Sequence, residues 1–479
     1  MNTLKLNTKR TIFVGFAFFL ITAFWQAYDA IIPLMLTNHF GLPQTASGAI
    51  MALDNIFALF MLPLFGAISD KTKTKYGKRT PFILFGTIAA IITFIALTFI
   101  DNYQLSMISE DIKALYPTGI TDPAIREEML QTVMSKTLDM TLSNIWPLIC
   151  FIGLLLIVLL SMATFRSPAV ALMPDVTVKP LRSKANAIIN LMGTAGGIFV
   201  LILGMVFKTS SDENAYMEYT AYIIAVCAIM ALGLSMFLFF VKEKKWNAEM
   251  LAEQEKLDKL SGEEQNSEEE KLSKAKLISL LLILASVALW FTGYNAVTTK
   301  YSLYATTILN QNYNLTLIIA QAAAIISYVP VGIVASKFGR KKTILAGVAL
   351  LALSFAIAIF INASTPEWFM YIIFALAGVA WATINVNSFP MVVELAKGSN
   401  IGKYTGYYYT ASMAAQVVTP VLSGAIMDLF GSMRPLFPYA AIFVILSFVT
   451  MFFVKHGNAQ DLDGKSARDI ISDNFGSDD

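Results

Sequence analysis

The chain has 479 residues, of which 56% are hydrophobic and only 14% are charged. A soluble domain of this size could not bury that much apolar surface, so the composition indicates a polytopic membrane protein and excludes an ordinary soluble enzyme. The formal net charge of +2 gives no reason to expect a nucleic-acid partner, and the two cysteines, Cys150 and Cys227, lie in apolar runs that do not suggest a disulfide framework.

Apolar runs of about 20 residues, the length that crosses a bilayer, recur along the whole chain. The first run is interpreted as a membrane span because it lacks the small-residue cleavage site of a signal peptide. The sequence therefore predicts an all-α membrane protein. Its twelve transmembrane helices are expected in the approximate ranges 12–37, 45–68, 80–100, 145–173, 184–207, 218–241, 277–299, 315–336, 343–361, 368–393, 404–430 and 435–455.

Lysine and arginine are concentrated in every second loop between these spans. They gather in residues 71–79, 179–184, 337–342 and 397–403, whereas the opposite loops are nearly bare. Because short loops rich in Lys and Arg stay on the cytoplasmic side, this set is predicted to be cytoplasmic. An even number of spans then places both termini inside, and we expect a multi-pass protein of the cell (plasma or inner) membrane.

Three segments are too polar to cross a membrane. Residues 242–276 are dense in Glu and Lys and are expected to form a charged cytoplasmic linker, partly helical or disordered. Residues 101–143 form an outside loop in which a short surface helix is expected, and residues 457–479 form a polar cytoplasmic tail. The expected organisation is an N-terminal six-helix bundle over residues 1–241, the linker, and a C-terminal six-helix bundle over residues 277–456.

The two halves of the chain carry the same pattern. FWQAYDA at residues 24–30 matches WFTGYNA at residues 290–296, since both read aromatic, aromatic, polar, small, Tyr, Asp or Asn, Ala. Further on, TFR at residues 164–166 matches TIN at residues 383–385. Because such matches follow one coherent set of offsets, we predict two pseudo-symmetric six-helix bundles related by an axis along the membrane normal.

The loops GAISDKTKTKYGKRT and GIVASKFGRKKT, which follow the second and eighth spans, resemble the loop signature of the major facilitator superfamily. The resemblance covers essentially the whole chain and implies the major facilitator fold, in which two bundles rock around a midplane site. Arg79 and Arg340 could pair with Asp175 and Glu394 and hold a cytoplasmic gate shut, with Asp70 as a further gating candidate. The alternative is that the basic residues only set the topology.

RSPAVALMPDVTVKPLRSKANAIIN, residues 166–190, resembles the sucrose and glycoside–pentoside–hexuronide:cation symporter branch of that superfamily, and its bacterial members most of all. The resemblance implies a carrier that moves a sugar, such as sucrose, maltose or another glucoside, together with a proton. One position departs from the pattern. Plant sucrose carriers have an arginine in a GPARAL-like string where this chain has Val170, and the nearest arginine is Arg166.

Three ionisable residues lie within predicted spans, where a charge costs a few kcal/mol. Asp29 and Asp54 are 12 and 13 residues from the turn at Gly41, so they are expected at similar depth on neighbouring spans. Two carboxylates close together in a low dielectric disfavour each other's ionised form, and this favours binding of a proton near neutral pH. Arg166 could pair with an aspartate or hold the substrate. The alternative for all three is a structural hydrogen bond between helices.

The repeat counterparts of Asp29 and Arg166 are the neutral Asn295 and Asn385. Rings can stack on the C–H faces of sugars and amides can bond their hydroxyls, although aromatics also line lipid-facing belts and amides also join helices. With Arg166, the candidate substrate-binding residues are Trp25, Tyr28, Asn55, Asn190, Tyr294, Asn295, Gln321, Trp381, Asn385 and Tyr408.

These features predict a proton-coupled secondary transporter of a neutral sugar that works by alternating access. A membrane-embedded enzyme is disfavoured because the sequence has no phosphate-binding GxxxxGK[ST] loop, no HExxH and no Cys/His metal spacing. No cofactor and no metal are therefore expected, and the expected partners are the sugar, the proton and the bilayer, with the protein a monomer. Sodium coupling, or efflux of another small solute, remains an alternative.

Overall fold

The computed structural model describes residues 6–120, 122–178, 181–261, 274–393 and 401–455. Within these ranges the chain is helical and forms no strand. Ten of the described helices are long and apolar enough to cross a membrane, and two shorter apolar segments, Tyr313–Tyr328 and Leu436–Phe452, complete the set. Each of the twelve predicted spans corresponds to one of these segments, so the predicted all-α membrane fold is confirmed.

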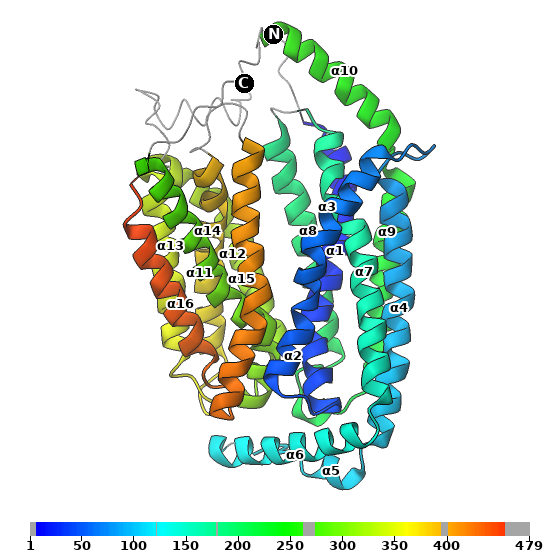
Figure 1. Ribbon diagram of the computed structural model, residues 1–479, viewed down its shortest axis with the longest axis vertical. Coiled ribbons are helices and arrows are strands. Elements are labelled where there is room, and N and C mark those ends of the chain that lie inside the picture. Colours follow the sequence, from blue (N-terminus) through cyan, green and yellow to red (C-terminus); the bar gives the residue numbers. More distant parts are fainter. Residues whose placement is uncertain (1–5, 121, 179–180, 262–273, 394–400, 456–479) are drawn as a thin grey trace.

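The helices form two side-by-side bundles with the same order of elements (Figure 1). In both, the first helix continues into a short π-helix, which supports the predicted pseudo-symmetry. The N-terminal bundle contains α1 (Thr8–Leu34), π-helix η1 (Met35–His39), α2 (Gln44–Met51), α3 (Leu53–Lys71), α4 (Thr80–Met107), α7 (Trp146–Asp175), α8 (Arg182–Val206) and α9 (Thr220–Phe240). The C-terminal bundle contains α11 (Lys274–Tyr304), π-helix η4 (Ala305–Leu309), α12 (Tyr313–Phe338), α13 (Arg340–Ala358), α14 (Trp368–Val393), α15 (Ile401–Phe430) and α16 (Leu436–Phe452).

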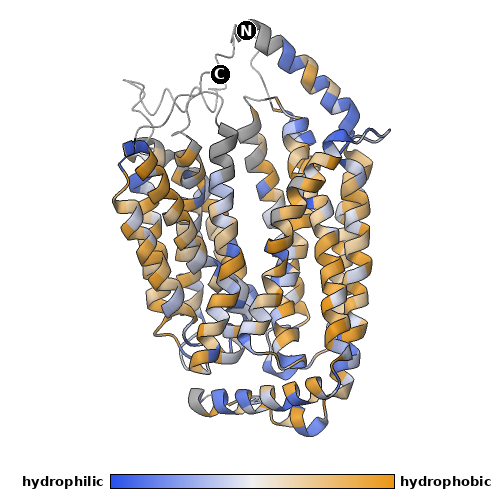
Figure 2. Ribbon diagram, in the orientation of Figure 1, coloured by the Kyte–Doolittle hydropathy of each residue, from blue (hydrophilic) through white to orange (hydrophobic). Residues whose placement is uncertain are grey.

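The outer faces of both bundles are apolar (Figure 2). Large side chains such as Phe85, Phe239, Phe360 and Leu429 are more than two-thirds exposed. In water such a surface would drive aggregation, whereas in a bilayer it faces acyl chains at no cost. Polar side chains inside the bundles must therefore find partners within the protein.

The two ends of the molecule differ. One end carries α10 (Glu243–Ser261), the start of α1 and the end of α16, and the other carries α5 (Glu110–Ala114) and α6 (Pro123–Ser143) (Figure 1). We call them the α10 end and the α6 end. The bundles approach closely at the α6 end, where a Cβ added to Gly48 on α2 would lie 2.0 Å from the carbonyl oxygen of Pro420 on α15. The Asp428 carboxylate of α15 also accepts the backbone N–H groups of Gln44 and Thr45, at 2.7 and 2.6 Å.

The first half of the charged segment 242–276 forms a helix, α10, that is anchored to the N-terminal bundle. Glu243 is buried, and its carboxylate accepts the backbone N–H groups of Lys78, Arg79 and Thr80 at 2.7–2.9 Å, which caps the start of α4. A carboxylate at a helix N-terminus satisfies free N–H groups and opposes the helix dipole. The expected helical part of the segment is therefore present as α10, and Glu243 anchors it to the N-terminal bundle. Residues 262–273 of that segment and the whole 457–479 tail lie outside the described residues.

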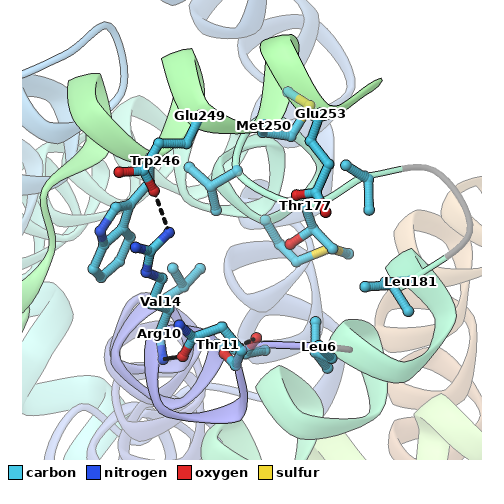
Figure 3. A pocket seen from close by; sticks show the side chains of 14 residues that line it. Leu6, Arg10, Thr11, Val14, Thr177, Leu181, Trp246, Glu249, Met250 and Glu253 are labelled. Atoms are coloured by element: carbon cyan, nitrogen blue, oxygen red, sulfur yellow. Dashed lines mark hydrogen bonds and ion pairs between the residues drawn. The ribbon is translucent and has the colours of Figure 1, made fainter. Parts of the chain in front are cut away.

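A pocket separates α10 from the ends of α1 and α7 (Figure 3). Across it, Arg10 Nη1 donates to Glu249 Oε2 at 2.5 Å, and the Arg10 guanidinium carbon lies 5.3 Å from the centre of the Trp246 ring. Together with the Glu243 cap, these contacts hold the first half of α10 against the N-terminal bundle.

The segment predicted as the 101–143 loop is also more ordered than expected. Helix α4 runs to Met107, beyond the predicted end at residue 100, because Asp101 is buried inside it with a partner. His39 Nδ1 lies 2.8 Å from Asp101 Oδ1, and both side chains are fully buried. The surface helix of this loop, α6, is 21 residues long rather than short.

Candidate functional site

The three in-span charges come from three helices of the N-terminal bundle. Asp29 lies on α1, Asp54 in the first turn of α3 and Arg166 on α7, and the three groups interact electrostatically with one another. The Arg166 guanidinium carbon lies 5.5 Å from the centre of the Trp25 ring, within cation–π range. Asn55 Nδ2 donates to Asp54 Oδ1 at 2.7 Å. The structure thus brings the predicted charged residues and two predicted polar ones into a single cluster.

A proline within α1 leaves a backbone acceptor free beside the Asp29 side chain. Pro33 lies inside α1 and has no N–H, so the carbonyl of Asp29, four residues earlier, loses its usual helical donor. The Ser302 hydroxyl of α11 lies 3.4 Å from that carbonyl oxygen and donates to it from the other bundle. The proline therefore creates an acceptor at the bundle interface, immediately beside the Asp29 side chain.

Several buried polar atoms of the cluster have no hydrogen-bond partner among the described residues. The Tyr28 hydroxyl is one of them, although Tyr28 is almost fully buried and interacts electrostatically with Asp29 and Asp54. Trp25 Nε1 is another. A buried polar group without a partner costs about 1–3 kcal/mol, so these atoms are positioned to bond a ligand or water.

The C-terminal bundle supplies an aromatic and amide wall. The rings of Tyr294 on α11 and Trp381 on α14 stack with centroids 3.7 Å apart, and Trp290 meets Trp381 edge-on at 5.3 Å. Asn295 Nδ2 has no partner among the described residues, whereas Asn385 forms a side-chain hydrogen bond with Tyr328 of α12. This wall carries no in-span charge at the positions that match Asp29 and Arg166.

Two contacts join the bundles at the level of the site. Gln321 Nε2 of α12 donates to Gln26 Oε1 of α1 at 2.6 Å, while Gln321 Oε1 has no partner among the described residues. Gly197 of α8 leaves the space, since a Cβ there would lie 3.1 Å from Gln321 Oε1. Arg166 also interacts electrostatically with Tyr409 of α15.

Not every predicted site residue joins the cluster. The Tyr408 hydroxyl lies 3.0 Å from Ser388 Oγ within the C-terminal bundle, and its neighbour Tyr409 is the one that faces Arg166. Asn190 lies on α8 with an exposed side chain. Sequence reasoning missed Gln26, Tyr328 and Tyr409. For Gln26 a signal existed, because it is a polar residue inside the FWQAYDA repeat.

The predicted gating residues of the first half form an ion network at the α10 end. Arg79 Nε donates to Asp175 Oδ2 at 2.8 Å, its guanidinium also contacts Asp70, and Lys78 Nζ lies 3.1 Å from Asp175 Oδ1. All four residues belong to the N-terminal bundle, so the network ties α3, α4 and α7 together. In the second half Arg340 begins α13 and Glu394 lies outside the described residues, so their pairing stays a prediction.

Removal of the Arg79 charge is expected to destabilise the protein. Arg79→Gln leaves Asp175, whose side chain is only 19% exposed, without its main partner. Breaking such a pair should lower the free energy of unfolding by about 3 kcal/mol. The midpoint of thermal unfolding in detergent measures the effect. Lys245→Gln is the control, because its pair with Glu249 is exposed and 3.9 Å long. Equal midpoints for Arg79→Gln and wild type would show that the network adds no stability.

Two family models match the chain. Residues 306–472 match the model described as Major Facilitator Superfamily, and residues 13–108 match the model described as MFS/sugar transport protein. Both are models of the major facilitator superfamily, and one matches in each half of the chain, in agreement with the resemblance seen in the sequence.

Individual proteins that resemble this chain are distant. An uncharacterized symporter of Synechocystis sp. (strain ATCC 27184 / PCC 6803 / Kazusa) is 22% identical over 201 residues, a match that covers 41% of this chain and only 31% of the relative. The inward open conformation of the xylose transporter XylE from E. coli gives a TM-score of 0.61 with 13% identity, over 97% of this chain and 98% of XylE. A POT family transporter in complex with 5-aminolevulinic acid gives 0.63 with 9% identity, over 93% and 95%. These identities establish a shared fold only.

Proposed function

We propose that the protein is a proton-coupled symporter of a neutral sugar, a disaccharide or another glucoside, and that it works by alternating access. The observation that carries the proposal is the cluster of Asp29, Asp54 and Arg166 in the N-terminal bundle, whose counterparts of Asp29 and Arg166 in the C-terminal bundle are the neutral Asn295 and Asn385. The match of residues 13–108 to a sugar-transport family model, the Synechocystis symporter and the xylose transporter add support.

Coupling follows from the charge balance of the cluster. With both aspartates ionised, two carboxylates and one guanidinium leave a net charge of −1, and binding of one proton makes the cluster neutral. A neutral site costs less to enclose in a low dielectric than a charged one. Binding of the proton and binding of the sugar therefore both favour the occluded state, from which the carrier can open to the other side of the membrane. This shared preference couples the flux of the sugar to the flux of the proton.

Recognition of a hydroxyl-rich solute follows from the atoms without partners. Trp25 Nε1 and Asn295 Nδ2 offer donors, Gln321 Oε1 offers an acceptor and the Tyr28 hydroxyl offers both. Sugar hydroxyls also donate and accept, and their C–H faces suit the Tyr294–Trp381 stack. Asn55 and Arg166 both interact with Asp54 and are proposed to contact the sugar with Asn385, whereas Asn190 and Tyr408 are assigned to a supporting or peripheral role.

The structure supports an inward-facing state in this scheme. The basic loops indicate that the α10 end, with both termini, is cytoplasmic in the cell membrane. The hydrogen bonds of Asp428 and the close approach at Gly48 join the bundles at the opposite, outer end. Asp70, Arg79 and Asp175, together with Arg340 and Glu394, are proposed to act when the cytoplasmic end closes.

Uptake by proteoliposomes tests the proposal. Labelled sucrose, maltose and a panel of other glucosides and monosaccharides are offered with no gradient, with an imposed pH gradient and with an imposed sodium gradient. We expect at least one sugar to accumulate under the pH gradient alone, relative to liposomes without protein. Accumulation under the sodium gradient alone would identify sodium, rather than the proton, as the coupling ion. No uptake of any sugar in the panel would contradict the proposed substrate class.

A further inference from the structure

Helix α6 lies across the α6 end of the molecule, beneath both bundles and roughly perpendicular to the membrane-spanning helices (Figure 1). Its chain position places it between α4 and α7 of the N-terminal bundle. Its first turns nevertheless lie beneath the C-terminal bundle, so one helix reaches across the boundary between the two moving parts.

The second half of α6 is fixed to the N-terminal bundle. Gly41, at φ +66°, follows η1, and a Cβ there would lie 2.5 Å from the backbone nitrogen of Leu138 and 2.6 Å from the carbonyl oxygen of Met134. Glycine adopts this φ without strain, and the lack of a Cβ allows the close approach to α6. Gln104 Nε2 of α4 donates to Thr141 Oγ1 of α6 at 2.9 Å. Helix α6 therefore moves with the N-terminal bundle.

The first half of α6 is bonded to the C-terminal bundle by Arg126, which is 1% exposed. Its Nη2 donates to the carbonyl oxygen of Thr306 at 2.7 Å, and its Nε to that of Thr307 at 2.6 Å. Both carbonyls belong to η4, the π-helix that ends the first span of the C-terminal bundle. The guanidinium also forms a two-pronged pair with Asp212, at 2.6 and 2.8 Å, in the loop between α8 and α9.

Further contacts extend this bridge along α6. Glu127 Oε1 accepts from Arg434 Nε at 3.1 Å and from the Ser432 hydroxyl, and Gln131 Nε2 donates to the carbonyl of Gly431. These partners lie between α15 and α16. Arg126 is buried, whereas the Glu127–Arg434 pair is half-exposed and contributes less.

We propose that α6 is a strap that holds the two bundles together at the α6 end, and that Arg126 is the positioning residue that sets how often this end opens. Opening separates Arg126 from the Thr306 and Thr307 carbonyls but leaves it paired with Asp212. The guanidinium therefore keeps a counter-ion in both states, and opening costs the hydrogen bonds to η4 without exposing an unpaired buried charge. The strap therefore raises the free energy of the open state without preventing the α6 end from opening and closing again.

A cysteine reporter tests the strap without any substrate, so its result does not depend on the proposed sugar. Ser302→Cys is placed in a background in which Cys150 and Cys227 are replaced by Ala, because Ser302 is 3% exposed between α11 and α1. The rate of labelling by a membrane-impermeant maleimide is measured in right-side-out and inside-out vesicles. Arg126→Gln should accelerate labelling from the α6 side at least about tenfold, the minimum expected for losing one hydrogen bond to a charged group. Lys113→Gln on α5 is the control, because its exposed pair with Glu110 joins residues of one helix.

A second set of variants covers the case in which Arg126→Gln fails to reach the membrane. Glu127→Arg and Arg434→Glu each place like charges together, and both should accelerate labelling by a few-fold. The double variant restores opposite charges and should return the rate toward that of the parent. Faster labelling with Arg126→Gln, or rescue in the double variant, supports the strap. Unchanged labelling in both sets of variants would overturn it.

Discussion

Asp29→Asn should abolish accumulation of the substrate against its gradient while leaving counterflow exchange. With one proton per solute, an imposed difference of about one pH unit supports roughly tenfold accumulation. The amide keeps the size and hydrogen-bonding capacity of the carboxyl group but cannot bind and release a proton. The substrate should therefore only equilibrate across the membrane. The matching position of the other bundle already carries the neutral Asn295. Uptake and exchange measured in the same proteoliposomes separate the two effects.

Two variants make this result specific. Asp101→Asn also neutralises a buried aspartate of the N-terminal bundle, but Asp101 pairs with His39 away from the site, so accumulation should persist in folded protein. Asp54→Asn tests the second carboxylate of the cluster. If Asp29→Asn still concentrates the substrate to the wild-type level, Asp29 is not the coupling group, and loss of accumulation in Asp54→Asn alone would assign that role to Asp54.

The fold could be predicted because its determinants are local in sequence. A bilayer requires about 20 consecutive apolar residues, and the hydropathy of each run reports this directly. The candidate charges could be found for the same reason, since Asp29, Asp54 and Arg166 stand out in apolar runs. The turn at Gly41 predicted that the two aspartates lie at similar depth, whereas the interaction of Arg166 with both of them is known only from the structure.

The contacts within the site could not be predicted, because they join residues far apart in the chain. Gln26 and Gln321 are 295 residues apart, and Glu243 caps a helix that begins 163 residues earlier. Composition also left the anchoring of one segment unspecified. Segment 242–276 is as polar as a solvated linker, yet Glu243 and Trp246 are buried against the N-terminal bundle. A few specific contacts outweighed the average polarity of that segment.

Helix α6 illustrates the same limit at the other end of the molecule. Its sequence is only weakly apolar, so it predicts a surface helix without indicating which surface it covers. Arg126 bonds carbonyls 180 and 181 residues further along the chain, in a π-helix that sequence patterns did not reveal. The link between the outer loop and the moving bundles is therefore a property of the tertiary structure alone.

Arg166→Lys is expected to weaken the apparent affinity for the sugar by about tenfold or more while leaving the pH profile of transport largely in place. Both side chains are charged, so the counter-ion of Asp29 and Asp54 is retained. Lysine lacks the planar fork that can bond two hydroxyls at once, and loss of one hydrogen bond to a charged group costs about 1.5–3 kcal/mol. It also changes the contact with the Trp25 ring, at 5.5 Å from the guanidinium carbon. Apparent KM and the pH dependence of uptake are measured on the same vesicles.

The chain offers a matched control for this substitution. Arg10 lies at the α10 end, 5.3 Å from the centre of the Trp246 ring and bonded to the carboxylate of Glu249, so its surroundings resemble those of Arg166. Arg10→Lys should leave both the affinity and the pH profile unchanged, because Arg10 lies outside the cluster. An unchanged affinity with a shifted pH profile in Arg166→Lys would assign Arg166 to the proton relay instead of the sugar. The Arg166 guanidinium would then serve to hold Asp29 and Asp54. The donors without partners among the described residues, Trp25 Nε1 and Asn295 Nδ2, would remain the candidates for sugar recognition.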